Sequence, residues 1–185
     1  MHTRLLVAAD KRSPSQGTIL TVWAAGNNEL IGCPQDVGIW CMNSLPVSVS
    51  IGACNFALQR HLYSSIGGQC FPLSPLAVAP TQGIVPWGDA FADFGKQGAG
   101  TSASAPQVAG ALAILNTAYP HLSNAELRAA LRASATPLGP DPDFNPGTGS
   151  GLINIPEALR IAPVAKQHKT YRYEKEFLER VSTVK

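Results

Sequence analysis

One stretch constrains the fold of this chain more than any other: residues 100–110, which read Gly-Thr-Ser-Ala-Ser-Ala-Pro-Gln-Val-Ala-Gly. Helices tolerate proline in their first turn and seldom deeper, so Pro106 predicts a helix that begins at about Ser102. The helix would continue through a run of almost wholly apolar residues: Val108, Ala109, Ala111, Leu112, Ile114 and Leu115. Apolar residues on every face predict a helix that is buried on all sides.

Ser102 would lie in the first turn, where unpaired backbone N–H groups and the positive helix end stabilise negative charge. A hydroxyl at this place is either a rigidly held nucleophile or an ordinary N-cap serine, and the helix start alone favours the N-cap. A second stretch, residues 18–28, reads Thr-Ile-Leu-Thr-Val-Trp-Ala-Ala-Gly-Asn-Asn and is typical of a buried strand that leads into a loop. An asparagine just past a strand can direct its amide N–H at an oxyanion.

A third stretch, residues 149–159, reads Gly-Ser-Gly-Leu-Ile-Asn-Ile-Pro-Glu-Ala-Leu and is typical of a closing loop with a short helix. In this order, the three stretches resemble the subtilisin-like serine proteases, or subtilases. That family has the nucleophile motif Gly-Thr-Ser-x-x-x-Pro-x-Val-Ala-Gly, the oxyanion motif Ala-Ala-Gly-Asn and the closing motif Gly-x-Gly-x-Ile/Val-Asn. The resemblance extends from about residue 5 to about residue 160. It implies a serine endopeptidase that hydrolyses peptide bonds in a polypeptide substrate.

The resemblance also implies roles for individual residues. Ser102 matches the nucleophile, and its own backbone N–H matches one oxyanion donor. Asn27 matches the side-chain oxyanion donor, with Asn28 as the alternative one position later. One wall of the pocket for the side chain before the scissile bond is matched by Ala24, Ala25 and Gly26.

A weaker similarity, to the kexin- and furin-like branch, concerns specificity. Residues 33–38 read Cys-Pro-Gln-Asp-Val-Gly, and Val-Trp precedes the Ala-Ala-Gly-Asn motif. This similarity implies that Asp36 contributes to an acidic pocket for a basic residue, where charge-assisted hydrogen bonds discriminate between substrates. The alternative is an aspartate on a surface loop, which is the more common environment of this residue type.

The base that a serine nucleophile needs has no counterpart in this chain. Family members place an Asp-Ser/Thr-Gly motif and a His-Gly-Thr motif well before Ala-Ala-Gly-Asn, but only 23 residues precede Ala24 here, and His-Gly-Thr does not occur. Asp36 begins a sequence that superficially resembles the aspartate motif. It is not the catalytic aspartate, because it follows Asn27 instead of preceding it and no apolar strand comes before it. Solvated or structural roles are predicted for all four histidines: His2, His61, His121 and His168. We therefore expect the C-terminal half of a subtilase catalytic domain, inactive without its missing N-terminal half.

The alternation of strand and helix patterns predicts an α/β fold: a partial subtilisin-like parallel sheet flanked by helices, with its N-terminal strands missing. Strands are predicted at residues 45–51, 74–79 and 83–85, and a Ser123–Glu126 capping box opens a helix that ends at about Ala135. Residues 1–162 are predicted to form the partial catalytic domain. Residues 163–185, with six of the 14 Lys and Arg but three of the 12 Asp and Glu, form a charged extension.

Composition excludes several functions. The net charge of +2 argues against nucleic-acid binding, and no apolar run is long enough for a membrane helix or, at the start, for a signal peptide. Four cysteines without a C-x-x-C pair argue against zinc and favour one or two disulfides in a secreted parent, with free thiols as the alternative. Asp141 and Asp143 read as a solvated turn, so no metal site is assigned, and calcium binding by a complete parent is left open.

Two other functions remain as alternatives to the endopeptidase. One is a non-catalytic, truncated subtilase relative or binding module that keeps the fold without the chemistry. The other is a different hydrolase, including the sedolisins, whose nucleophile motif also contains Gly-Thr-Ser-Ala-Ser-Ala-Pro. Asn27 argues against sedolisins, and residues 100–104 lack the second glycine of the α/β-hydrolase nucleophile elbow.

Overall fold

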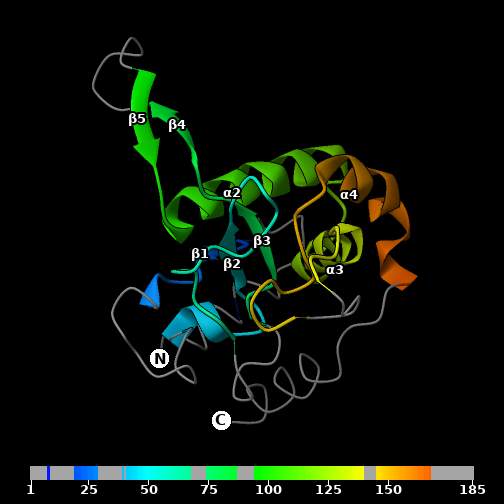
Figure 1. Ribbon diagram of the computed structural model, residues 1–185. Coiled ribbons are helices and arrows are strands. Elements are labelled where there is room, and N and C mark those ends of the chain that lie inside the picture. Colours follow the sequence, from blue (N-terminus) through cyan, green and yellow to red (C-terminus); the bar gives the residue numbers. More distant parts are fainter. Residues whose placement is uncertain are drawn as a thin grey trace.

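The computed structural model describes residues 8, 19–28, 39, 41–67, 74–86, 94–139 and 145–167. The elements within these ranges are, in chain order, β1 (Val22–Ala24), η3 (Cys41–Ser44), β2 (Val49–Cys54), β3 (Ala77–Pro80), β4 (Gly83–Pro86), β5 (Phe94–Gly98), α2 (Thr101–Ala118), α3 (Asn124–Ser134), α4 (Ile155–Ile161) and η4 (Ala162–Gln167) (Figure 1). Among the described residues, no helix has both the length and the apolar character needed to cross a bilayer.

A parallel sheet lies at the centre of the molecule, with its strands in the order β1, β2, β3. The register pairs Val22 with Val49, and Ile51 with Ala77. Beyond β3, the Val78 N–H donates to the Gly151 carbonyl at 2.9 Å, so the closing stretch of the chain extends the sheet. A three-stranded parallel sheet packed against helices confirms the predicted α/β class.

The hydrophobic core lies between this sheet and the helices α2 and α3. Alternate residues of β2 contribute to it, because side chains along a strand point to opposite faces. Its buried members include Val49, Ile51, Ala77, Val108, Leu112, Leu115, Leu127 and Leu131. The intervening β2 residues Ser50 and Gly52 are small, which leaves the opposite face of the strand close to its neighbours: a Cβ at Gly52 would lie 3.0 Å from a side-chain atom of Val78.

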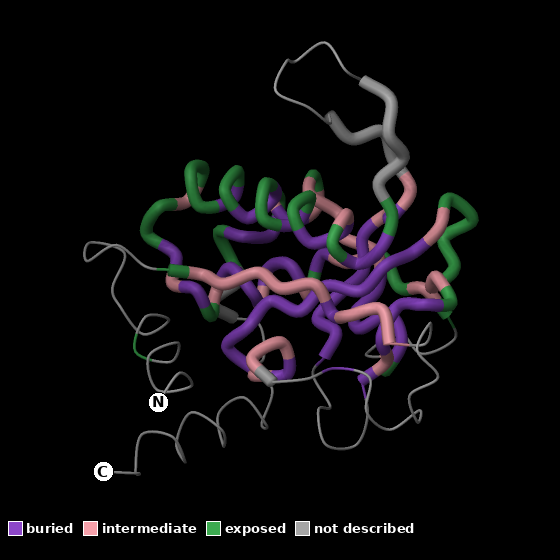
Figure 2. Tube along the Cα trace, turned by 90° about the vertical axis from the view of Figure 1, so that its left-hand side faces the viewer, coloured by how far each residue is buried: buried purple, intermediate pink, exposed green. Residues whose placement is uncertain are grey.

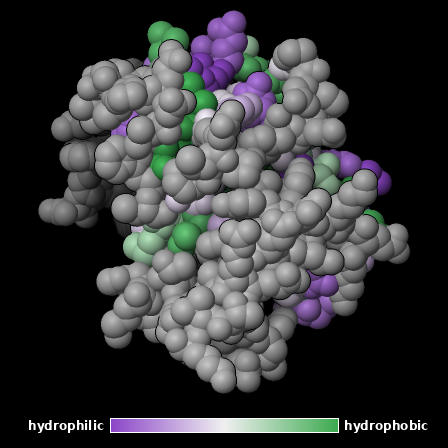
Figure 3. Space-filling view, turned by 90° about the horizontal axis from the view of Figure 1, so that it is seen from below, coloured by the Kyte–Doolittle hydropathy of each residue, from purple (hydrophilic) through white to green (hydrophobic). Residues whose placement is uncertain are grey.

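Helix α2 begins at Thr101, one residue before the predicted start, and Pro106 is its sixth residue. The predicted burial on all sides is wrong: Ala109 is exposed, and Ile114 is 53% exposed. Only one face of the helix packs on the sheet, so the opposite face is exposed along its length (Figure 2). In Figure 3, a view from below, small hydrophobic areas of the described residues lie beside strongly hydrophilic ones.

The predicted strands exist, but their bounds and partners differ from the expectation. The strand expected within residues 18–28 is β1, which is three residues long and half-buried. The strand expected at residues 45–51 is β2, which begins and ends later, at Val49–Cys54. The segment at 83–85 is β4, which pairs antiparallel with β5, a strand that the sequence pattern did not indicate. This hairpin projects from the body of the molecule (Figure 1).

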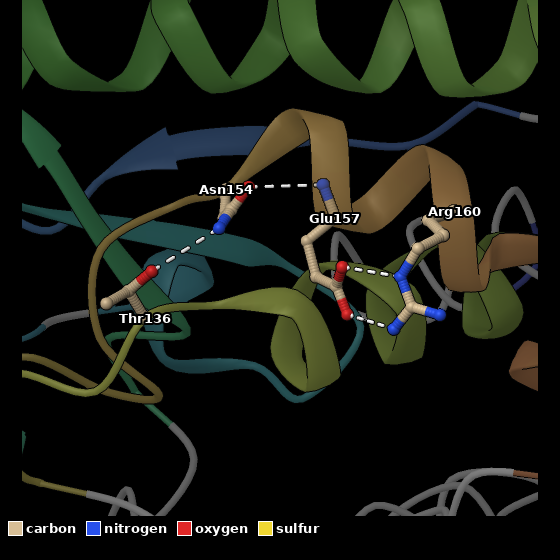
Figure 4. Close-up of polar contacts among 4 residues, drawn as sticks. All are labelled: Thr136, Asn154, Glu157 and Arg160. Carbon is tan, nitrogen blue, oxygen red and sulfur yellow. Dashed lines mark hydrogen bonds and ion pairs between the residues drawn. The ribbon is translucent and has the colours of Figure 1, made fainter.

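Side-chain caps begin the two later helices. The predicted capping box of α3 is confirmed, because the Ser123 hydroxyl accepts the Glu126 N–H and the Glu126 carboxylate accepts the Ser123 N–H. At α4, the Asn154 Oδ1 accepts the Glu157 N–H at 3.1 Å, and the Glu157 carboxylate pairs with Arg160 at 2.6 Å (Figure 4). The hydrogen bond from Arg160 holds the pKa of the Glu157 carboxyl below its usual value.

The structure tests the cysteine prediction at one position. The Cys54 thiol is free and buried at the end of β2, and burial raises its pKa. Two disulfides are thereby excluded, since one of the four cysteines is unpaired. Asp36, Asp141 and Asp143 lie outside the described residues, as do residues 168–185. Within the described ranges, no three His, Cys, Asp or Glu side chains gather into a group that could hold a metal ion.

Candidate active site

The start of α2 contacts the loop that follows β1, although 74 residues separate Asn27 from Thr101. The backbone N–H and the hydroxyl of Thr101 both donate to the Asn27 side-chain oxygen, each at 3.0 Å. The same hydroxyl accepts the Gly26 N–H at 3.1 Å. Thr101 is fully buried, and its hydrogen bonds connect two of the predicted site segments.

These contacts orient the Asn27 amide. Because its oxygen faces the two Thr101 donors, its nitrogen lies on the other side of the amide group. Among the described residues, that nitrogen makes no hydrogen bond. It lies close to Gly100, where a Cβ atom would come within 2.9 Å of it and where the backbone φ is +94°. Glycine is therefore required at position 100 for both conformation and space.

Backbone donors at the start of α2 are only partly satisfied. The Thr101 N–H is bound by Asn27, and the Ala103 N–H donates to the Gly100 carbonyl at 2.9 Å. The Ser102 N–H between them has no partner within the described part of the chain. Ser102 is exposed, and its hydroxyl is likewise without a hydrogen bond there. An exposed hydroxyl thus lies at the positive end of an 18-residue helix, on the same residue as a backbone N–H that no described group accepts.

Residues 24–26 are held in place from both sides. The Ala24 carbonyl accepts the Asn43 amide at 2.8 Å, and the Ala25 N–H donates to the Ile51 carbonyl at 2.8 Å. At Gly26, φ is +111°, and a Cβ atom would approach the Ser65 hydroxyl to 2.8 Å. A side chain at that position would therefore collide with its neighbour. The backbone of the predicted pocket wall is thus held by hydrogen bonds and has no room for a side chain at Gly26.

The first turns of α2 are also fixed to the end of β3. The buried Ser104 hydroxyl donates to the Ala79 carbonyl at 3.0 Å, and the Gln107 amide donates to the Pro80 carbonyl at 2.7 Å. Sequence reasoning missed these anchoring roles, and that of Thr101, because the motif alone does not say which residues its polar side chains meet.

The structure joins the start of α2, which contains Ser102, to Asn27 and Gly26 through Thr101, while Asp36 lies outside the described residues. Neither described histidine forms a hydrogen bond with Ser102. The His61 ring stacks on Tyr63 with 3.8 Å between centroids, and the exposed His121 ring meets Tyr119 edge-on. A separate pocket of about 210 Å³ lies between β1, α2 and α3, and its lining includes Leu20, Val22, Leu112 and Leu127.

Comparison with known proteins identifies the family of this chain. Residues 3–151 match the model of the subtilase family of peptidases. The chain is 33% identical over 158 residues to subtilisin from Bacillus pumilus, covering 85% of this chain and 52% of that protein. It is equally similar to subtilisin E from Bacillus subtilis (strain 168), of which it covers 38%. The chain thus spans about half, or less, of the length of these curated relatives.

Solved structures share the fold. A serine protease of Aeromonas sobria aligns with a TM-score of 0.68 at 20% identity, over 86% of this chain and 39% of that one. The PatG macrocyclase in complex with peptide aligns with a TM-score of 0.64 at 24% identity, over 85% of this chain and 47% of that one. With the family match covering most of its residues and the motif segments meeting at the start of α2, this chain belongs to the subtilase family.

Proposed function

We propose that this chain carries the nucleophile and the oxyanion site of a serine endopeptidase. The observation that supports this most directly is the orientation of Asn27: its oxygen accepts both Thr101 donors, while neither its amide nitrogen nor the Ser102 N–H has a hydrogen-bond partner among the described residues. Two N–H donors on neighbouring groups suit an oxygen that gains negative charge during acyl transfer.

In the proposed reaction, the Ser102 hydroxyl oxygen attacks the scissile carbonyl carbon, and a base takes the hydroxyl proton. The carbonyl oxygen becomes an oxyanion, which accepts hydrogen bonds from the Asn27 amide and the Ser102 N–H. The positive end of α2 adds to the stabilisation of this charge. The hydrogen-bonded backbone of residues 24–26 would form one wall for the side chain that precedes the cut bond.

The base is proposed to come from a segment other than those described, with the chain as the C-terminal half of a catalytic domain. Two observations support this. No described histidine forms a hydrogen bond with Ser102, and β1 has no strand partner on its outer edge among the described residues. Parallel sheets are normally covered on both faces and continued at such edges. An upstream half would supply the Asp and His motifs together with further parallel strands.

Cleavage after basic residues is the proposed specificity, with Asp36 as the acidic partner of the substrate side chain. A peptide library presented to the complete protease tests this part alone. A preference for Arg or Lys before the cut, lost in Asp36→Asn, is the expected result. Equal cleavage after Leu and Arg would contradict it and would leave the role of Ser102 untouched.

A second candidate, a relative without catalytic activity, is favoured by the same absence of a described base. Labelling with a fluorophosphonate, which reacts with activated serines, separates the two. We expect no labelling of the chain alone, and labelling at Ser102 when a segment with the family's Asp and His motifs is present. Ser102→Ala serves as the control. Absence of labelling in both preparations would support the non-catalytic relative and contradict the endopeptidase.

A further inference from the structure

Gly100, the N-cap residue of α2, closes a ring of hydrogen bonds with two hydroxyl groups that are remote in the sequence. The Gly100 N–H donates to the Tyr63 hydroxyl at 2.8 Å, and the Thr81 hydroxyl donates to the Gly100 carbonyl at 2.8 Å. The Tyr63 and Thr81 hydroxyls also bond to each other. These residues lie 37 and 19 positions before Gly100 in the sequence.

The direction of each hydrogen bond follows from the number of protons. A threonine hydroxyl has one proton, and that of Thr81 goes to the Gly100 carbonyl. Tyr63 must therefore donate to the Thr81 oxygen, while its own oxygen accepts the Gly100 N–H. Each donor has one acceptor, and the ring closes on the two backbone groups of a single residue. With Tyr63 8% and Thr81 1% exposed, water has little access to replace a lost partner.

Gly100 needs such support because of where it lies. It is the N-cap residue of α2, has a φ of +94°, and offers no side chain to cap the helix. Its carbonyl also accepts the Ala103 N–H, the first backbone hydrogen bond of the helix start. Fixing both of its backbone groups fixes the direction in which the chain enters α2, and hence the place of Ser102 two residues later.

We propose that Tyr63 and Thr81 are positioning residues for the chemistry at Ser102, acting through Gly100. This rests on the proposed function. Neither hydroxyl touches the substrate in this proposal. They hold the nucleophile and the N–H of Ser102 in line with the Asn27 amide, and catalytic groups lose much of their effect when displaced by about 1 Å.

Steady-state kinetics on the protease that joins this chain to the segment supplying the base tests the proposal. Tyr63→Phe and Thr81→Val each remove one hydroxyl while preserving shape. We expect each to lower kcat about 10- to 100-fold with little change in KM, because orientation is lost and binding is kept. The double variant should be little worse than either single one, since both break the same ring. Thr81→Ser, which restores the hydroxyl, should regain most of the turnover.

Tyr119→Phe is the matched control. Its hydroxyl donates to the Leu159 carbonyl at 2.8 Å, a tyrosine hydrogen bond between α2 and α4 that is no part of the ring. We expect it to leave kcat unchanged even where it lowers the melting temperature. An equal loss of kcat in Tyr119→Phe, unchanged kcat in Tyr63→Phe, or a loss confined to KM would overturn the positioning role.

Amide hydrogen exchange at Gly100 supplies a readout that needs no activity. The Gly100 N–H should exchange slowly in the wild type and much faster in Tyr63→Phe, with the core amides of β2 unchanged. Fast exchange in the wild type would overturn the inference whatever the kinetics show. Full activity in Ser102→Ala would instead overturn the proposed function. The exchange result would then still show whether Tyr63 holds the Gly100 N–H.

Discussion

Replacing Thr101 by valine tests how the site is assembled, because this one hydroxyl joins two segments. Valine has nearly the same shape, so the fully buried position stays filled. The substitution removes the hydroxyl bond to the Asn27 oxygen and the acceptor of the Gly26 N–H. The backbone N–H of Thr101 still donates to Asn27, so the amide keeps one of its two anchors.

The expected cost comes from the groups that lose their partners. A buried N–H left without an acceptor costs about 1–3 kcal/mol, and a lost neutral hydrogen bond costs about 1 kcal/mol. For Thr101→Val, we therefore expect the free energy of unfolding to fall by about 2–4 kcal/mol. Turnover of the complete protease should fall about tenfold as well, because an amide with one anchor is less well oriented toward the oxyanion.

Urea denaturation and peptide hydrolysis measure the two effects on the same preparations. Thr101→Ser keeps the hydroxyl and should retain most of both quantities. Thr117→Val is the matched control: its hydroxyl donates to the Ala113 carbonyl at 2.8 Å on the exposed side of the same helix, so its loss should cost less than about 0.5 kcal/mol. A Thr101→Val protein as stable and active as the wild type would refute the reasoning.

Four further outcomes are expected. Asn27→Ala should lower turnover of the complete protease by about 10²–10³ with little change in KM, a magnitude taken from the oxyanion asparagine of subtilisin, a relative; unchanged kcat would rule out the oxyanion role. Gly100→Ala places a Cβ atom against the Asn27 amide nitrogen at a residue whose φ is +94°. It should lower the free energy of unfolding by about 1–3 kcal/mol and also lower kcat. Calorimetry and kinetics check this, and an unchanged stability and kcat would contradict the geometry. Leu115→Ala, at a fully buried position facing the sheet, should cost about 2–5 kcal/mol in urea denaturation, against a small effect for the half-exposed Ile114→Ala. Because its folded-state pKa is lowered, Glu157 stabilises the fold above its usual pKa, and this contribution is lost as the pH falls through the lowered value; an NMR titration of its carboxyl should show a higher midpoint in Arg160→Gln, and an identical midpoint would exclude the ion pair as the cause.

The elements predicted well from the sequence depend on neighbours within a few residues. The capping box of α3 needs only Ser123 and Glu126. Pro106 and Gly100 together predicted the start of α2 to within one residue. The parallel α/β class followed from the alternation of apolar strands and helical stretches. Such features are local because backbone sterics and first-turn hydrogen bonds act over three or four residues.

Predictions failed where distant parts of the chain determine the outcome. The open outer side of α2 reflects which surfaces pack against it, and its apolar sequence could not show that Ile114 has no covering partner among the described residues. Strand β5 became visible only through its pairing with β4. A strand's partner depends on register and chain closure across many residues, which no local pattern records.

The candidate site shows the same division. The sequence by itself determined that Ser102 lies in the first turn of a helix that follows a glycine, and that Asn27 follows a strand. Both are consequences of local conformation. Only the tertiary structure decided that Thr101 holds the Asn27 oxygen across 74 residues, and that Tyr63 and Thr81 close a ring around Gly100. The physical reason is that hydrogen bonds between remote side chains form only after the sheet and helices have packed, so their partners are set by the fold.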